Sequence, residues 1–305
     1  MKLSNLHVHT HFCDGTGTPE DYCRAAVDAG LVSIGFSAHA PLAEKTGLTS
    51  DWHLPREQFT AYRDAVLACR AEYAALSPPL PVYLGLEADY ISGFQMPRIG
   101  GLDYTIGSLH CVVPPDISAA AFFARAGKML TIDGSPEEWR LLIDEFFGGD
   151  VRRLVDAYLR EMREMIQEGG FDILGHADLI KKNNNPALAP KKYLFDETDA
   201  AYRRGIEGIV RALEGSGIVV EINTGGISRG RTKETYPALD FLRLLRESGI
   251  EVAVNGDSHY PEHIAAGYET AVETARAAGY TQTLLFEGRQ NGKPVWKPEP
   301  LTVEI

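Results

Sequence analysis

The chain has 305 residues, a length that suits one α/β barrel or an elaborated doubly wound sheet. Hydrophobic residues make up 44% of the sequence and charged residues 24%, which is ordinary for a globular protein with a sizeable core. The 42 acidic residues outnumber the 30 basic ones, and the formal net charge of −12 argues against broad binding to nucleic acid or to anionic lipid. A small phosphorylated substrate can still be bound by a local basic cluster or by metal ions.

The cysteines and the apolar runs indicate in which cellular compartment the protein resides. Cys13, Cys23, Cys69 and Cys111 are scattered without a Cys-x-x-Cys pair, which is unlike a disulfide-stapled secreted domain but neither proves nor excludes a disulfide. The chain enters a His-rich stretch almost at once, so we expect no signal peptide. No apolar run reaches about 18 residues, the length needed to span a membrane. We therefore expect a cytoplasmic protein without a membrane partner, and its oligomeric state is left open.

Strands and helices are predicted to alternate along the chain. The first helix begins at Thr18, a good N-cap, with Pro19 in the first helical position, and Gly30 follows its end. Strands are predicted at residues 3–6, 31–37, 81–86, 104–109, 171–174, 218–222, 251–255 and 282–286, the last followed by an extended tail. Helices are predicted at residues 18–29, 55–76, 118–126, 136–147, 151–168, 197–214, 237–247 and 264–278.

This alternation implies parallel strands covered by helices. Polar residues cluster at the C-terminal end of almost every strand, whereas an open doubly wound sheet would concentrate them at one switch point. We therefore expect a closed or nearly closed barrel of about seven βα units, forming one domain over residues 1–305. Residues 112–149 have mixed helical patterning, and we interpret them as an insertion or lid.

The first strand leads into a stretch that is rich in potential metal ligands. His7, His9 and His11 alternate, and Asp14 follows before a turn at Gly15. Residues two apart on a strand point the same way, so His7 and His9 can share one ion. A single His-x-His motif is a weak signal, and on this stretch alone a chance alternation on a half-exposed strand remains an alternative.

The ends of the later strands supply more residues of the same kind. For any one histidine a structural role would be the better interpretation, but a joint occurrence at one end of successive strands indicates a metal site. Mixtures of His and carboxylate select divalent Zn, Mn or Fe. His53 and His263 lie away from the pattern, and His11 is uncertain. The strand-end residues are His7, His9, His39, Glu87, His110, His176, Asp257 and His259.

The order of these motifs resembles the PHP (polymerase and histidinol phosphatase) family over nearly the full length of the chain. More narrowly, the chain is similar to the histidinol-phosphatase branch, through Phe-Cys beside Asp14, the Gly-Ser-Leu-His110 strand end and the run His176-Ala-Asp-Leu-Ile-Lys-Lys. The family motifs are His7-x-His9, Ser-Ala-His39, Gly-Leu-Glu87, Gly-Ser-Leu-His110, Leu-Gly-His176-Ala-Asp and Gly-Asp257-Ser-His259.

The resemblance implies a distorted (β/α)7 barrel that holds two to three divalent ions (Zn, Fe or Mn) at the C-terminal ends of its strands. Glu87 would bridge two of these ions. Some relatives have a histidine in place of Asp14, so the resemblance implies a weaker or differently selective third site, for which His11 is a competing ligand. The implied ligand sets are His7, His9, Glu87 and Asp257 for one ion, Glu87, His110 and His176 for the second, and Asp14, His39 and His259 for the third.

The resemblance also implies an activity. The chain would be a phosphomonoesterase that hydrolyses L-histidinol phosphate to L-histidinol and phosphate in histidine biosynthesis. A metal-bridging hydroxide held by Glu87, with Asp257 and His259, would attack the phosphorus. The sequence does not identify the proton donor for the leaving group.

Substrate phosphate also needs fixed donors from the protein. Arg229, in the loop after the sixth strand, is the first candidate because Arg can bind phosphate through two parallel bonds, and Lys181 is the second. Either residue could instead be a solvated surface charge, and the nearby pair Gly225-Gly226 could be only a turn.

Other functions fit the same ligand pattern. Within the family, the alternatives are a nucleotide phosphatase or a nuclease acting on 3′ ends. The acidic net charge and the lack of a basic or aromatic groove in the sequence argue against a nucleic-acid substrate. A metal-binding module without turnover is the alternative from another class.

Overall fold

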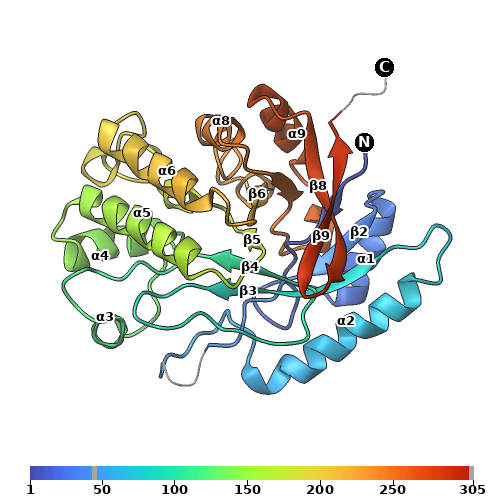
Figure 1. Cartoon of the computed structure of the whole chain (residues 1–305). Helices are drawn as coiled ribbons and strands as arrows, with labels where there is room; N and C mark the ends of the chain where they lie inside the picture. The colour runs from blue at the N-terminus through green and yellow to red at the C-terminus, as the bar shows by residue number, and fades with distance from the viewer. Residues whose placement is uncertain (43–46, 302–305) are drawn as a thin grey trace.

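The structure is a computed structural model that describes residues 1–42 and 47–301. Its centre is a parallel sheet of seven strands in which each strand pairs with the next along the chain. This consecutive order, with helices around the outside, confirms the predicted (β/α)7 barrel (Figure 1). The strands are β1 (Ser4–Asn5), β2 (Ser33–Phe36), β3 (Val82–Asp89), β4 (Tyr104–Ser108), β5 (Ile173–Leu174), β6 (Val219–Asn223) and β7 (Val252–Asn255).

The first and last strands meet and nearly close the barrel. Just beyond their ends, Val8 and Ser258 form a parallel bridge, and the His9 N–H donates to the Ser258 carbonyl at 2.9 Å. The Leu6 N–H donates to the Asn255 side chain at 2.9 Å. The His-rich stretch after β1 is therefore brought against the loop after β7, although some 250 residues separate them.

Eight helices of the described residues follow the predicted order, with differences of up to four residues at their ends, and a ninth, at Gly225–Ser228, lies where the sequence predicted only a glycine loop. The predicted N-cap of the first helix is present, because the Asp21 N–H donates to Thr18 Oγ1 at 3.2 Å. Short 3-10 turns lie at Arg56–Gln58, Leu179–Lys181, Lys191–Tyr193 and Pro261–His263. The α-helices are α1 (Pro19–Asp28), α2 (Phe59–Tyr73), α3 (Ala119–Ala126), α4 (Pro136–Phe146), α5 (Val151–Glu168), α6 (Ala200–Leu213), α7 (Gly225–Ser228), α8 (Leu239–Glu247) and α9 (Tyr268–Ala277).

The interior of the barrel is filled by side chains that recur every second residue along the strands. The Tyr104 ring, on β4, crosses this interior, and its hydroxyl donates to the carbonyls of Leu6 (2.5 Å) and Phe36 (3.0 Å). A Cβ at Gly35 of β2 or Gly85 of β3 would lie 2.4–2.5 Å from Tyr104 atoms, so both of these strands need glycine there. The tyrosine thus fixes the spacing of three strands below the polar end of the barrel.

A hairpin covers the amino end of the strands. The strand predicted at 282–286 extends to Gln290 as β8 (Gln282–Gln290), and the predicted tail is β9 (Lys293–Pro300), paired antiparallel with it. Asn291 and Gly292 have φ values of 53° and 75°, which suits the tight turn that an Asn-Gly pair makes in hairpins. The predicted extended tail is therefore the second strand of a hairpin, and residues 302–305 of that tail lie outside the described residues.

Residues 112–149 contain α3 and α4, whose N-caps are Ser118 and Ser135. The Trp139 side chain of α4 is fully buried, and its Nε1 donates to the Tyr193 carbonyl at 3.1 Å. The buried side chains under both helices belong to the main apolar core of the barrel. A role for this segment as a lid stays a prediction. Across the described residues, no helix has both the length and the apolarity to cross a membrane.

Candidate metal centre

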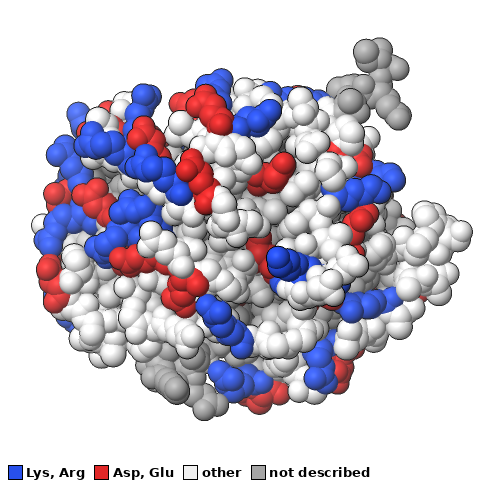
Figure 2. Space-filling view, in the orientation of Figure 1, with Lys and Arg blue, Asp and Glu red and all other residues white. Residues whose placement is uncertain are grey.

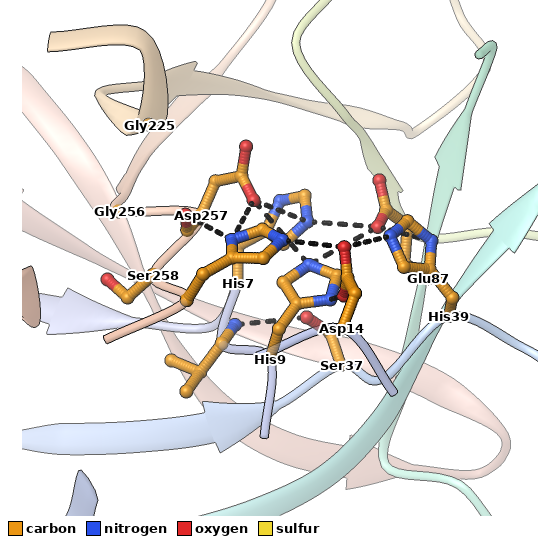
Figure 3. Close-up of polar contacts among 12 residues, drawn as sticks. His7, His9, Asp14, Ser37, His39, Glu87, Gly225, Gly256, Asp257 and Ser258 are labelled. Atoms are coloured by element: carbon orange, nitrogen blue, oxygen red, sulfur yellow. Dashed lines mark hydrogen bonds and ion pairs between the residues drawn. The ribbon is translucent and has the colours of Figure 1, made fainter. Parts of the chain in front are cut away.

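Seven of the nine predicted ligands line one hollow of about 280 Å³ at the carboxyl ends of the strands, and the other two, His7 and His9, are fully buried beside it. Glu87 lies at its centre with a side chain that is only 1% exposed. Figure 3 shows the imidazoles of His7 and His9 pointing toward Glu87 and Asp257. Glu87 Oε2 lies 3.3 Å from His7 Nε2 and 3.4 Å from His9 Nε2, and Asp257 Oδ1 lies 3.8 and 3.5 Å from the same two nitrogens. Candidate ligand atoms of His7, His9 and Glu87 all lie within 4.8 Å of one another, and those of His7, His176 and Asp257 form a second such group, so each group of three could hold a cation.

The other oxygen of Glu87 faces a second pair of histidines. Glu87 Oε1 lies 3.1 Å from His176 Nε2 and 3.8 Å from His110 Nε2. Candidate ligand atoms of these three buried residues all lie within 4.8 Å of one another. Glu87 therefore has the geometry of a carboxylate that could bridge two cations, one on each oxygen.

Asp14 is the centre of a third group at the rim of the hollow. Its carboxylate lies 3.2 Å from His9 Nδ1, 3.1 Å from His259 Nε2 and 3.7 Å from His39 Nε2. The Asp14 side chain is 30% exposed, far more than Glu87. The Nδ1 of His9 faces Asp14 and its Nε2 faces Glu87, so the group around Asp14 adjoins the group around Glu87.

Unpartnered buried atoms indicate that these groups suit cations. Among the described residues, His7 Nε2, His9 Nε2, His39 Nδ1 and Glu87 Oε2 are buried without a hydrogen bond. Buried polar atoms of proteins are normally paired, so atoms that converge unpaired fit a ligand that is not part of the chain. The donor set of imidazole and carboxylate is the one that Zn, Mn and Fe prefer.

The carboxylates and His9 have the charge states that suit metal binding, whereas burial is outweighed by nearby carboxylates that raise the pKa of His7, His39 and His110. Burial alone would raise the pKa of Glu87, but His39, His7 and His110 outweigh it and hold this pKa well below its ordinary value. Burial, together with His259 and His39, lowers the pKa of His9 to about 4. Ionised carboxylates and neutral imidazole are the forms that bind metal. Burial lowers the pKa of His110, but Asp89 and Glu87 outweigh it and raise this pKa to about 10, so a cation bound there would displace a proton.

Three further residues of the site were not among the predicted ligands. Glu221, on β6, accepts from His7 Nδ1 at 2.9 Å and from the His176 N–H at 2.8 Å, so it orients one ligand and anchors another. Asp89, on β3, lies 2.5 Å from His110 Nδ1 and 3.2 Å from His53 Nε2. His53, which had been set apart from the pattern, is thus buried beside the centre.

The remaining histidines lie elsewhere. His11 is exposed, and its Nδ1 contacts the Gly17 carbonyl at 3.0 Å rather than any of the candidate ligand groups. His263 lies in the 3-10 turn after β7, with its ring 5.4 Å from that of Tyr260. Within the described residues, His11 and His263 are outside every group that could hold an ion.

Arg229 lies at the rim, at the end of the short helix α7 that follows β6. Its Nη2 donates to Asp257 Oδ2 at 3.0 Å, and its Nη1 lies 2.8 Å from His259 Nδ1. A Cβ at Gly225 would lie 2.6 Å from Asp257 Oδ2, so glycine is required for this approach. Asp257 has a φ of 47°, an uncommon conformation for a residue other than glycine, and one typical of functional sites.

The two neighbouring lysines point to different places. Lys182 lines the central hollow, where its ammonium donates to Asp133 at 2.9 Å. Lys181 lines an adjoining hollow and pairs with Glu234 at 3.0 Å and with Glu197 at 3.3 Å. Arg229 and Lys182 are thus the basic side chains of the described residues that face the candidate ligands.

The barrel and its strand-end ligands agree with a comparison to known families. Residues 5–225 match the PHP domain, and the chain belongs to this family. A protein of Deinococcus radiodurans named "Probable histidinol-phosphatase" is 30% identical, over 94% of this chain and 98% of the relative. The histidinol-phosphatase of Bacillus subtilis is 24% identical, over 90% of this chain and 99% of that protein.

Solved structures agree on the fold. A candidate histidinol phosphatase of Listeria monocytogenes aligns with a TM-score of 0.72 at 21% identity, over 88% of this chain and 99% of that one. The histidinol phosphate phosphatase of Lactococcus lactis, in complex with zinc, L-histidinol and phosphate, aligns with a TM-score of 0.64 at 20% identity, over 93% of this chain and 96% of that one.

Proposed function

We propose that this protein is a metal-dependent phosphatase that hydrolyses L-histidinol phosphate to L-histidinol and phosphate in histidine biosynthesis. The observation that carries the proposal is the convergence of imidazole and carboxylate groups on one hollow, in a chain related over nearly its whole length to histidinol-phosphatases. The complex of the Lactococcus lactis protein with zinc, L-histidinol and phosphate supports this substrate.

We propose two to three divalent ions held by the predicted ligand sets, with Glu87 shared between two of them. Bound ions would supply Lewis acidity, which acidifies water and offsets the charge of the phosphoryl group. Glu87, Asp257 and His259 would position the attacking water on the side of the hollow that faces the phosphorus. Glu221 and Asp89 would keep the rings of His7 and His110 in place, because each accepts from the ring nitrogen that faces away from Glu87.

Arg229 and Lys182 would bind the phosphate oxygens. Arg229 is 25% exposed and Lys182 16%, so both can reach a ligand in the hollow while their stems stay packed. Burial lowers the pKa of Arg229, but Asp257 outweighs it and raises this pKa, so the guanidinium remains charged. Lys181 stays a prediction as a second phosphate contact, and its three acidic neighbours already compensate its charge.

A nuclease activity is the main rival within the family. On the face seen in Figure 2, basic side chains are interspersed with acidic ones rather than gathered in one continuous stripe. A nucleic-acid groove needs such a stripe to follow the phosphate backbone. The surface therefore favours a small substrate, and the absence of a nucleic-acid partner stays a prediction.

The test compares phosphate release from three substrates by the metal-loaded protein. We expect L-histidinol phosphate to exceed a nucleoside 3′,5′-bisphosphate and the 3′-phosphate of a short DNA in kcat/KM by more than about tenfold, because those substrates lack the matching leaving group. Faster turnover of a nucleotide or of DNA would replace this proposal with one of its family rivals. Protein that binds two or more equivalents of metal but releases phosphate from none of the substrates would be a binding module without turnover.

A further inference from the structure

One carboxylate on the wall of the metal hollow has no part in the candidate ligand groups. Four acidic side chains line this hollow. Asp14, Glu87 and Asp257 each belong to groups that could hold an ion, whereas Asp133 belongs to none found among the described residues. Metal binding therefore does not account for Asp133, although its side chain lines the same hollow as Arg229 and Lys182.

The position of Asp133 is fixed by the segment that carries it, between α3 and α4. The Ile132 N–H donates to the His110 carbonyl at 2.9 Å, which ties this segment to the end of β4. Asn183 Nδ2 donates to the carbonyls of Ile132 (3.0 Å) and Gly134 (3.1 Å), on either side of Asp133. Leu130 and Ile132 are fully buried and anchor the chain below it. A side chain held on both flanks in this way is preorganised for a ligand.

Asp133 is paired with Lys182, and both side chains remain accessible. The ammonium of Lys182 donates to Asp133 Oδ2 at 2.9 Å, while 26% of the Asp133 side chain and 16% of the Lys182 side chain are exposed. Burial raises the pKa of Asp133, but Lys182 and His110 outweigh it and lower this pKa, so the carboxylate is charged. The wall thus presents a fixed anion beside a fixed cation.

We propose that Asp133 binds the cationic amino group of the substrate while Lys182 and Arg229 bind its phosphate, which makes the hollow selective for phosphate esters of amino alcohols. This inference rests on the proposed phosphatase function and assigns its substrate selectivity to the segment between α3 and α4. In L-histidinol phosphate only two carbons and the ester oxygen separate the amino nitrogen from the phosphorus. Adjacent opposite charges on the wall match such a ligand, because the amino group approaches Asp133 as the phosphate approaches Lys182.

The same carboxylate disfavours esters that lack the amino group. When the phosphate of such an ester approaches Lys182, Asp133 is left facing another anion, and like charges across a binding site cost affinity. Asp133 therefore contributes to selectivity twice, by attraction to one ligand and by repulsion of the other.

The test is the variant Asp133→Asn, assayed on two esters that differ only in the amino group, L-histidinol phosphate and 3-(imidazol-4-yl)propyl phosphate. We expect kcat/KM for L-histidinol phosphate to fall roughly 10- to 100-fold, the usual cost of one charge-assisted hydrogen bond, mainly through KM. Turnover of the ester without the amino group should be unchanged or faster. The dissociation constant of L-histidinol, measured by calorimetry on metal-loaded protein, should rise by a similar factor.

The matched control is Asp116→Asn, which removes an exposed carboxylate of the same segment that pairs with Arg153 instead. It should leave both esters unaffected, and thermal melts and metal content should match wild type in both variants. Equal losses on the two esters would overturn the proposal, because Asp133 would then only position Lys182, and unchanged kinetics would make it a solvated charge. If the wild type hydrolyses neither ester, the proposed function fails separately, and the calorimetry still decides whether Asp133 binds the amino group.

Discussion

The two ends of the barrel are built on the same strands but with opposite chemistry. At the amino end, Phe286 of the hairpin packs with Tyr104 and Ile173 in an apolar cluster. At the carboxyl end the interior positions carry ionisable groups. The strand β3 contains both, since Tyr83 packs on the Phe286 ring while Glu87, four residues later, faces the candidate metal ligands. The strand β3 is therefore apolar where it packs on the hairpin and ionisable where it reaches the hollow.

The polar end has an energetic cost that the apolar end does not have. Buried carboxylates and imidazoles lose hydration, and unpaired charges in an interior are destabilising. Divalent ions would offset that cost, because a ligand that binds only the folded state stabilises it. The two ends should therefore respond differently to substitution, with activity and metal content changing at one end and stability at the other.

The largest effect is expected at the centre of the polar end. Glu87→Gln keeps the shape of the side chain but removes the charge between two candidate ion sites, so we expect activity to fall roughly a thousandfold or more. Elemental analysis of protein purified without chelator should find about two to three equivalents of Zn, Fe or Mn in wild type and fewer in the variant.

The control for this change is Glu287→Gln, an exposed carboxylate of the hairpin that pairs with Lys297. It should leave metal content and turnover as in wild type. A Glu87→Gln protein with full metal content and activity would show that Glu87 does not bridge ions.

The next effect concerns the apolar end. Phe286 is 2% exposed and packs against Tyr83, Tyr104 and Trp296. Phe286→Ala should lower the free energy of unfolding by about 3–5 kcal/mol, the usual cost of such a cavity. Urea titration of the metal-loaded protein measures it. Turnover per folded molecule at low temperature should not change, because the ligands lie at the other end.

The matched control is Leu141→Ala on α4, where the side chain is 41% exposed and little stability should be lost. Loss of turnover in folded Phe286→Ala protein would contradict this expectation, because it would show that packing at the amino end affects the site at the carboxyl end.

The sequence predicted that most candidate ligands converge at one end of the barrel, because they follow hydrophobic runs and parallel strands bring their C-terminal ends together. Glu221 was missed because it lies inside β6 rather than after it, and Asp89 because β3 continues three residues past the predicted strand end at residue 86. Asp89 lies two residues beyond Glu87, so a spacing of two residues along β3 carried the signal.

Two other features could not be predicted for physical reasons. Lys181 and Lys182 are adjacent in sequence, and which of them faces the hollow depends on the phase of a short 3-10 turn whose start the sequence does not define. The strand β9 is rich in charge and proline, and three of its partly buried residues, Pro294, Val295 and Trp296, are consecutive, so it lacks the alternation that identifies a strand. The turn at Asn291 and Gly292 was the available signal for the hairpin.

A smaller effect is expected at the rim of the polar end. Arg229→Ala removes a guanidinium that faces the hollow, and loss of one charge-assisted contact costs about 2–4 kcal/mol, or roughly a hundredfold in kcat/KM. Arg229→Lys should restore only part of this, because a point charge cannot replace two parallel bonds. The measurement is the kinetics on L-histidinol phosphate, with metal content determined in parallel. A loss of kcat/KM at unchanged metal content indicates lost phosphate binding, whereas a lower metal content indicates the lost contact with Asp257.

Arg243→Ala provides the comparison, since this exposed residue of α8 pairs only with Asp240 in the described contacts. It should behave as wild type. Full activity in the Arg229→Ala protein would leave Lys182 as the phosphate contact and make Arg229 a positioning residue for Asp257.

The smallest effect is expected where the polar end opens to solvent. Asp14 is 30% exposed, whereas Glu87 is 1% exposed, so water and chelator reach the third ligand group more easily. A carboxylate is also a harder ligand than imidazole, which favours Mn or Fe over Zn at this group. Mild chelation should therefore remove about one equivalent of metal before the others. Asp14→Asn should lack that equivalent as purified, while the two sites that share Glu87 stay filled.

Stepwise dialysis against chelator, followed by elemental analysis and thermal melts, measures this order of metal loss. Simultaneous loss of all ions, or unchanged metal content in Asp14→Asn, would make Asp14 a turn residue and leave the polar end with the two sites that share Glu87.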